Sequence, residues 1–198
     1  MRCSHVVDDK PLLRASVLRR RAARDAAERV AAGENIAAHG LTAASGARVV
    51  AAYAAVGAEP PTRLLLEALV RAGVRVVLPA VDGAGLRWGE LRDWSGLAAS
   101  ELGLLEPTRV SEDAATAAAD ADLLIVPALA VGRDGYRLGR GGGFYDRWLP
   151  ARPRGRVLAA VYDDELLTAL PHEPHDRRVD AALTPGGVVA VGDDRFGQ

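Results

Sequence analysis

The chain has 198 residues, of which 49% are hydrophobic, and its formal net charge at pH 7 is -1. This length and composition are typical of one globular domain with a substantial core, and they exclude an intrinsically disordered chain. The balanced charge gives no reason to expect binding to a polyanion such as nucleic acid.

The first nine residues, 1–9, are expected to form a flexible extension ahead of a single domain at residues 10–198. Cys3, the only cysteine, lies in this extension, so no internal disulfide can form and the chain fits a reducing compartment. Acidic residues follow soon after Met1, where a secretory signal would be basic and then apolar. No apolar run in the sequence approaches the roughly 20 residues of a membrane-spanning helix. We therefore expect a cytoplasmic protein with no membrane partner.

A long helix is predicted over residues 10–29, because the acidic pair at 8–9 is a typical helix cap and a proline follows in the first turn. Three apolar side chains are expected on its buried side: Leu13, Val17 and Val30. Gly33 and Gly40 are expected to interrupt the helix, because glycine is unfavourable in a helix interior.

Apolar strand-like runs then alternate with helical patterns. The predicted strands are residues 48–56, 74–78, 86–91, 123–129, 157–161 and 179–183, and the predicted helices are residues 62–72, 144–149 and 165–170. The first two strands and the helix between them form a βαβ unit, and Pro79 is expected to end the second strand. Because the strands are apolar throughout, the sequence predicts an α/β fold of the Rossmann-like kind. This is a single three-layer, open, mainly parallel sheet with helices on both faces.

Residues 135–147 form the most informative stretch, because glycines, arginines and one carboxylate stand within a few positions of one another. Successive glycines let peptide N–H groups turn toward an anion. Arginines supply positive charge, and Asp146, one turn into the following helix, can hold a divalent cation beside phosphates. This combination predicts a site for a magnesium nucleotide. The alternative is a plain glycine-rich surface turn before a helix.

Two common nucleotide signatures do not fit this stretch. A Walker loop needs a lysine after its glycines, and a dinucleotide fingerprint needs Gly or Ala where Phe144 stands. The stretch follows the strand at 123–129, and Glu59 follows the strand at 48–56, so both loops are expected to face one crevice at the carboxyl ends of the strands. The alternatives for Glu59 are a solvated loop acid and a helix-start acid ahead of the prolines at 60–61.

Lys10 is the only lysine among the 25 Lys and Arg residues of the chain, and it lies one helical turn before Arg14. A compact ammonium group suits a phosphate where a planar guanidinium does not, so Lys10 is a candidate phosphate ligand. The alternative is an accidental lysine on a solvated basic face. That face would continue through Arg19, Arg20, Arg21 and Arg24.

Residues 137–146 resemble, almost letter for letter, the R-L-G-x-G-x-G-[YF]-Y-D signature of the 5-formyltetrahydrofolate cyclo-ligase family, the methenyltetrahydrofolate synthetases. Other features follow in the same order as in that family: K-x-x-x-R at Lys10 and Arg14, a loop glutamate at Glu59, and a closing segment at residues 174–180. The resemblance extends over residues 10–184.

One segment departs from the family pattern. Many members carry a basic or aromatic residue after the second strand, where this chain has Ala-Val-Asp-Gly-Ala-Gly at residues 80–85. Trp88 or Trp94 is the candidate to pack on the pterin in its place.

The resemblance implies an ATP- and Mg²⁺-dependent cyclisation of 5-formyltetrahydrofolate to 5,10-methenyltetrahydrofolate, with release of ADP and phosphate, through a phosphorylated formyl intermediate. The implied partners are ATP and a reduced folate, with no nucleic acid and no membrane, and the chain is expected to be a monomer. Two alternatives stay open. One is a related α/β ATP-dependent enzyme acting on another small amide or a thiamine-like compound, and the other is a non-catalytic nucleotide-binding protein.

The resemblance also implies site residues. The implied catalytic residues are Arg140 and Asp146, and the implied magnesium ligands are Asp146 and Asp176. The implied ATP-binding residues are Lys10, Arg14, Arg137, Leu138, Gly139, Arg140, Gly141, Gly142, Gly143, Phe144 and Tyr145. The implied folate-binding residues are Arg14, Ala54, Glu59, Arg140 and Phe144, with Glu59 accepting hydrogen bonds from the pterin.

Overall fold

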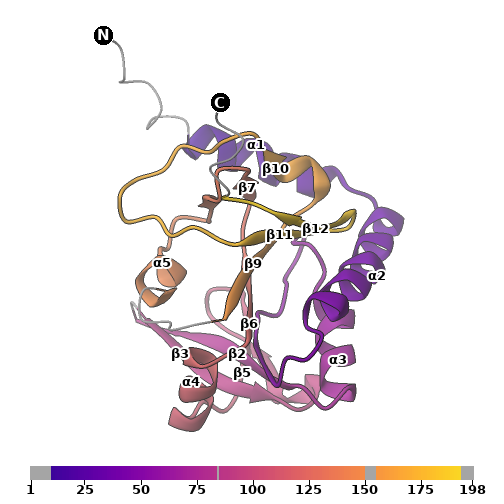
Figure 1. The fold of residues 1–198 in the computed structure, drawn as a ribbon, viewed down its shortest axis with the longest axis vertical. Coiled ribbons are helices and arrows are strands. Elements are labelled where there is room, and N and C mark those ends of the chain that lie inside the picture. The colour runs from indigo at the N-terminus through magenta and orange to yellow at the C-terminus, as the bar shows by residue number, and fades with distance from the viewer. Residues whose placement is uncertain (1–9, 84, 150–154, 193–198) are drawn as a thin grey trace.

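A seven-stranded sheet forms the centre of the computed structural model, which describes residues 10–83, 85–149 and 155–192 (Figure 1). The extension expected at residues 1–9 lies outside the described residues. The helices are α1 (Lys10–Ala23), α2 (Ala26–Ala43), α3 (Arg63–Arg71), α4 (Glu112–Ala119), α5 (Phe144–Trp148) and the 3-10 turns η2 (Trp94–Gly96) and η4 (Asp163–Glu165).

The strands of the large sheet are β1 (Val49–Ala51), β2 (Arg75–Asp82), β3 (Gly85–Leu91), β6 (Leu123–Pro127), β9 (Arg156–Ala160), β11 (Ala181–Thr184) and β12 (Gly187–Ala190). Their order is β12-β11-β9-β6-β1-β2-β3, and only the two edge strands, β12 and β3, pair antiparallel. The described residues also form two small sheets: β10-β7-β8, with β7 (Ala130–Gly132), β8 (Arg137–Leu138) and β10 (Leu166–Leu167), and β4-β5, with β4 (Leu97–Ala99) and β5 (Leu105–Pro107).

Helices cover both faces of the large sheet, as the sequence predicts. In β6 the side chains alternate between the two faces: Leu123 and Ile125 pack in one core cluster, and Leu124 and Val126 in another. The first cluster includes Ile36 of α2 and the buried leucines of α3, and the second includes the alanines of α4. Figure 1 shows α2 and α3 on one side of the sheet and α4 and α5 on the other. The expected three-layer α/β architecture is therefore confirmed.

The predicted βαβ unit is confirmed as β1, α3 and β2, in which Val50 of β1 pairs in parallel with Val76 of β2. The expected end of β2 at Pro79 is wrong, because this strand continues to Asp82 in a hairpin with β3. Proline has no N–H to donate to a neighbouring strand. The pairing of β2 with β1 already ends at Val77, so Pro79 removes no hydrogen bond between these two strands.

The single long helix predicted at residues 10–29 is wrong, because the chain breaks it into α1 and α2 at Arg24 and Asp25. Asp25 caps α2 in a capping box with Glu28, which satisfies backbone N–H groups at the new helix start. The break turns α2 so that Val30, expected to be buried, is 60% exposed.

Gly33 and Gly40 lie inside α2 and do not interrupt it, which also corrects the sequence-based expectation. A Cβ atom on Gly40 would lie 2.5 Å from Cδ2 of Leu65 in α3. Glycine at this position therefore lets α2 and α3 approach closely, and the packing compensates for its low helix propensity.

The helix α1 covers the small β10-β7-β8 sheet through Val17, which packs with Leu129 and Leu138. A helix expected at residues 165–170 is wrong: a 3-10 turn is followed there by β10, which pairs in parallel with β7. The residues of β10 pair with Val131 and Gly132 of β7, which are distant in sequence. No local sequence pattern therefore predicts this strand.

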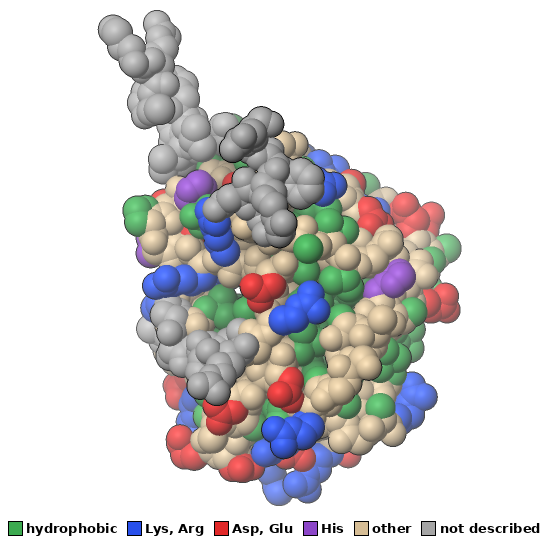
Figure 2. All heavy atoms as spheres, in the orientation of Figure 1, with side chains coloured by type: hydrophobic (Ala, Val, Ile, Leu, Met, Phe, Trp, Pro, Cys, Tyr) green, Lys and Arg blue, Asp and Glu red, His purple; other side chains and the backbone are tan. Residues whose placement is uncertain are grey.

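Among the described residues, no helix has the length and apolar character needed to cross a bilayer. The face drawn in Figure 2 carries interspersed acidic and basic side chains. This mixture agrees with the balanced net charge of the sequence.

Candidate functional site

The loops that follow β1, β6 and β8 line one cleft of about 340 Å³, together with the start of α1. The expectation that the Glu59 loop and the glycine stretch face a common crevice is therefore confirmed. Apart from the two candidate tryptophans, every residue given a site role from the sequence lies along this cleft: Lys10, Arg14, Ala54, Glu59, Arg137, Leu138, Gly139, Arg140, Gly141, Gly142, Gly143, Phe144, Tyr145, Asp146 and Asp176. Their individual roles stay predictions.

The glycine loop, residues 139–143, has a backbone that other residues would strain. Gly141 and Gly143 have φ angles of +105° and +65°, in the region that favours glycine. Two arginines hold the loop through its carbonyl groups: Arg14 Nε donates to the oxygen of Gly139 at 2.9 Å, and Arg147 Nη2 donates to the oxygen of Gly142 at 2.9 Å. The loop thus has a fixed path from β8 into α5.

Asp146 of α5 is held by two donors on the same oxygen. Arg137 Nη2 donates to Oδ1 at 2.8 Å, and the backbone N–H of Arg177 donates to it at 3.1 Å. Arg137 in turn donates to the carbonyl oxygen of Arg177 at 2.8 Å. These bonds join the glycine stretch to the closing segment at residues 174–180, so two regions far apart in sequence meet at the cleft.

Lys10 lies between two carboxylates of that closing region. Its Nζ is 2.8 Å from Oδ2 of Asp176 and 3.2 Å from Oε1 of Glu173. Burial alone would favour the neutral amine, but the hydrogen bonds to these acids outweigh it and raise the pKa of Lys10. Burial opposes ionisation of Asp176 too, and the bond from Lys10 outweighs it and lowers the pKa of that carboxyl. Both groups therefore stay charged around neutral pH.

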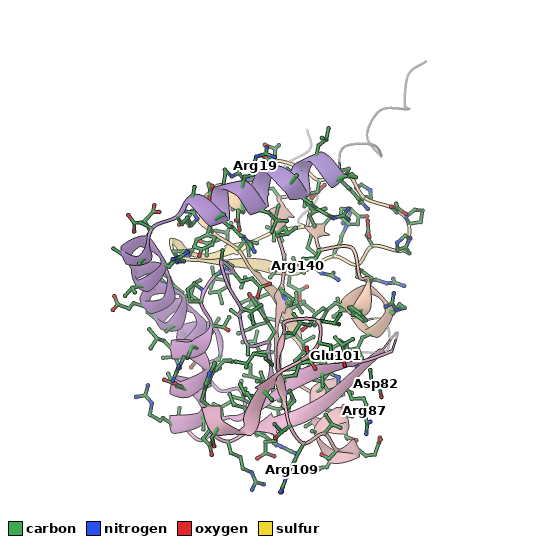
Figure 3. The ribbon with its side chains drawn as sticks, turned by 180° about the vertical axis from the view of Figure 1, so that it is seen from behind. Arg19, Asp82, Arg87, Glu101, Arg109 and Arg140 are labelled. Atoms are coloured by element: carbon green, nitrogen blue, oxygen red, sulfur yellow. The ribbon has the colours of Figure 1, made fainter. Side chains whose placement is uncertain are left out.

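Glu59 and Arg140 meet across the cleft. Arg140 Nη2 lies 3.0 Å from Oε1 of Glu59, while the backbone N–H of Val56 donates to Oε2 at 3.0 Å. Glu59 is only 7% exposed and Arg140 is 54% exposed. Figure 3 shows Arg140 near the middle of the molecule. The alternative of a solvated loop acid is therefore wrong for Glu59.

The arginines of α1 do not share one solvated face. Arg21 is buried and forms a two-bonded pair with Glu165, in which Nε and Nη2 each lie 2.7 Å from a carboxylate oxygen. Its Nη2 also donates to the carbonyl oxygen of Ala128, which lines the cleft, at 2.7 Å. Arg19 and Arg20 are exposed, which agrees with the alternative of a solvated basic face for these two residues.

Neither candidate tryptophan lines the cleft. Trp88 is buried and packs against Trp148, with ring centroids 4.7 Å apart, and Trp94 lies beneath the guanidinium of Arg63. Apolar side chains from the β2–β3 hairpin and the segment around β5 line the cleft instead: Pro79, Val81, Leu86, Leu104 and Leu105. A flat ring can therefore pack on aliphatic side chains here.

Sequence reasoning missed Tyr53, which follows β1 and lines the cleft. Its hydroxyl and that of Tyr145 are buried and have no hydrogen-bond partner among the described residues. The apolar run in which Tyr53 stands gave no sign that its hydroxyl would be left unpaired. What marks Tyr53 as a candidate is a buried, unpaired hydroxyl on a residue that lines the cleft. That feature can be recognised only in the structure.

The carboxylates fit a magnesium ion bound together with phosphates. In the described part of the chain, no group of three or more His, Cys, Asp and Glu side chains forms a metal cage. Mg²⁺ commonly uses one or two protein carboxylates and completes its shell with water and phosphate oxygens. Asp146 and Asp176 line the same cleft and supply such a pair.

Comparisons with known proteins agree with this geometry. The sequence model of the 5-formyltetrahydrofolate cyclo-ligase family matches residues 6–185. The 5-formyltetrahydrofolate cyclo-ligase of Mycolicibacterium smegmatis is 48% identical over 152 residues, which cover 73% of this chain and 77% of the relative. That of Escherichia coli K12 is 33% identical over 147 residues, or 72% and 80% of the two chains.

A solved structure shares the fold. The NMR structure of Aquifex aeolicus 5,10-methenyltetrahydrofolate synthetase superposes with a TM-score of 0.77 at 27% identity. The alignment covers 93% of this chain and 94% of the other.

Proposed function

The chain belongs to the 5-formyltetrahydrofolate cyclo-ligase family and is a ligase, and we propose that it converts 5-formyltetrahydrofolate to 5,10-methenyltetrahydrofolate at the expense of ATP. One observation carries this proposal. The glycine loop, the start of α1 and the Glu59 loop line a single cleft, so a nucleotide and a folate can lie side by side.

The residues that line the cleft are of two chemical kinds. Cationic side chains and the glycine loop suit a triphosphate, and we place ATP there, with Lys10, Arg137 and Arg140 on its phosphate oxygens. Arg14 is placed against both the nucleotide and the polar end of the folate, because it lines the cleft and donates to Gly139 of the glycine loop. Aliphatic side chains with Ala54, Glu59 and Phe144 suit a reduced pterin, and we place the folate there.

The proposed reaction activates a poor leaving group. The formyl oxygen attacks the γ-phosphorus of ATP and ADP leaves, which gives the phosphorylated formyl intermediate. N10 of the folate then attacks the formyl carbon, N10 loses its proton, and phosphate departs as the ring closes. Such a phosphoryl transfer asks the protein for positioning and charge neutralisation. The cations of the cleft supply both to the transferred group.

Asp146 and Asp176 are the proposed holders of Mg²⁺. When bound, the ion would neutralise phosphate charge that the arginines and Lys10 leave uncompensated. Arg137 then keeps Asp146 in place through their 2.8 Å contact, and Lys10 does the same for Asp176. We further propose a monomeric, cytoplasmic enzyme whose partners are ATP and a reduced folate, with no nucleic acid and no membrane.

The activity has a direct test. Incubation of the protein with 5-formyltetrahydrofolate and Mg·ATP should produce the near-ultraviolet absorbance of the methenyl product, with one ADP released for each product molecule. Neither a kinase-like enzyme for another amide or a thiamine-like compound nor a non-catalytic nucleotide-binding protein predicts this absorbance. Binding of Mg·ATP without any methenyl product would contradict the proposal.

Lys10→Arg tests the phosphate role of the only lysine. A guanidinium is larger than the ammonium that now fits between Asp176 and Glu173, and it presents a planar fork where a point charge is needed. We expect the Kd for Mg·ATP, measured by calorimetry, to rise about tenfold, which corresponds to roughly 1.4 kcal/mol.

The matched control is the reverse exchange, Arg19→Lys, on the exposed side of α1 (Figure 3). It should leave the Kd for Mg·ATP unchanged. A Lys10→Arg variant that binds ATP as well as the parent would remove the lysine from the phosphate site.

A further inference from the structure

Tyr53 lines the cleft and carries an unsatisfied hydroxyl. The residue lines the cleft, yet its Oη atom is buried and has no hydrogen-bond partner within the described residues. Leaving a buried hydroxyl unpaired is unfavourable, and such groups are usually satisfied. An unpaired donor on a residue that lines a ligand site therefore points to a partner supplied by the ligand.

The backbone around Tyr53 is held firmly. Oγ1 of Thr62 donates to the carbonyl oxygen of Tyr53 at 2.9 Å and accepts from the N–H of Ala55 at 2.9 Å. The next residue, Ala54, forms an isolated antiparallel bridge with Leu105. The backbone that carries the phenol is thus positioned before any ligand arrives, which lowers the entropic cost of using this residue in recognition.

The hydroxyl is a donor over the whole working pH range. Burial, and then the neighbouring carboxylate of Glu59, raise the pKa of Tyr53 well above its ordinary value. The phenol therefore keeps its proton. Arg21, Tyr145 and Glu165 are also near enough to act on this group, and only Arg21 works in the opposite direction.

The folate offers a matching edge. Along one side of its pyrimidine ring, the reduced pterin presents two donors, the 2-amino group and N3–H, and then one acceptor, the 4-oxo oxygen. A carboxylate accepts from two parallel donors, which is the role proposed for Glu59, but it cannot satisfy the adjacent oxygen. That oxygen needs a donor close to Glu59.

We propose that the Tyr53 hydroxyl is this donor, and that Tyr53 and Glu59 together read the donor–donor–acceptor edge of the pterin. The inference rests on the proposed function, because it assumes a reduced folate in this half of the cleft. It makes Tyr53 a substrate-binding residue that fixes the orientation of the pterin. The reacting formyl group lies on the other ring of the pterin and takes no hydrogen bond from Tyr53.

The test compares Tyr53→Phe with the parent. We expect the Kd and KM for 5-formyltetrahydrofolate to rise about tenfold, as the loss of one buried hydrogen bond predicts. The KM for ATP and the kcat should stay near those of the parent. The midpoint of thermal unfolding without ligand should not fall, because the exchange removes a hydroxyl that has no partner among the residues the structure describes.

Tyr136→Phe is the matched control, because it removes a phenol hydroxyl from a ring that stacks on His172 outside the residues lining the cleft. It should leave both folate constants unchanged. Three results would overturn the proposal: a Tyr53→Phe variant with an unchanged folate Kd, a loss confined to kcat, or a fall in the unfolding temperature that reveals a structural partner.

The proposed function fails separately. A parent protein that makes no methenyl product contradicts the cyclo-ligase assignment. Calorimetry can then still compare the affinities of the parent and of Tyr53→Phe for 5-formyltetrahydrofolate. Equal affinities contradict the role of Tyr53 while leaving the activity assignment intact. A parent that does not bind the folate at all contradicts both.

Discussion

Asp146→Asn is expected to lower kcat about 100-fold or more, because the exchange removes a negative charge where a metal-bound phosphoryl group would be transferred. The amide keeps the size of the side chain and can still accept from the backbone N–H of Arg177. Arg137, however, loses its ionic partner at 2.8 Å. The amide oxygen can still accept the hydrogen bond from Arg137, so the variant should keep its fold, which circular dichroism checks. The loss of activity then reports the missing charge, which steady-state turnover at saturating ATP and folate measures.

The requirement for metal gives a second reading of the same variant. If Asp146 holds Mg²⁺, the Mg²⁺ concentration that gives half-maximal turnover should rise in Asp146→Asn. Asp113→Asn is the control, since Asp113 is 79% exposed on α4 and pairs with Arg75 away from the cleft. Turnover of Asp146→Asn equal to that of the parent would exclude Asp146 from the mechanism.

Arg21→Met is expected to destabilise the protein by about 3–5 kcal/mol, the usual effect of breaking a buried ion pair by removing one partner. Arg21 and Glu165 are 2% and 0% exposed, so the remaining carboxylate would stay buried without its counter-ion. The exchange also removes the donor to Ala128, which ties α1 to the cleft. Chemical denaturation, followed by circular dichroism, measures the loss in the free energy of unfolding.

Two further variants isolate the cause. Adding Glu165→Gln to Arg21→Met should restore part of the stability, because a neutral amide is less costly to bury than an unpaired carboxylate. Arg92→Met is the control, since Arg92 is 84% exposed and its pair with Glu90 is worth little. A loss for Arg21→Met no larger than that of the control would contradict the importance of the buried pair.

The convergence of the glycine stretch and the Glu59 loop on one cleft was the most predictable feature of the molecule. Residues 137–146 carry their geometry locally, because Gly141 and Gly143 take φ angles that few other residues accept. The meeting of this stretch with Glu59 follows from a general property of parallel sheets, whose strand ends share one edge. The apolar strands likewise made the central sheet predictable, since burial on both faces requires them.

Interactions between distant residues were the least predictable. Arg21 reads as one of several arginines on a basic helix, and only its pairing with Glu165, 144 positions along the chain, makes it a core residue. The edge strand β12 and the short β10 are likewise defined by their neighbours in space. The break before α2, in contrast, has a local cause that the sequence contains. Asp25 and Glu28 have the spacing of a capping box, but the helical pattern on both sides favoured one continuous helix.

The contact between Arg140 and Glu59 has a consequence for how the two substrates bind. Under the proposed assignments, Arg140 binds the triphosphate and Glu59 binds the pterin. Without ligands the two side chains form an ion pair with each other, at 3.0 Å between Nη2 and Oε1. Drawing Arg140 toward a triphosphate frees Glu59 for the pterin, and engaging Glu59 frees Arg140. The enzyme would then show positive thermodynamic linkage, in which nucleotide and folate increase each other's affinity by the same factor.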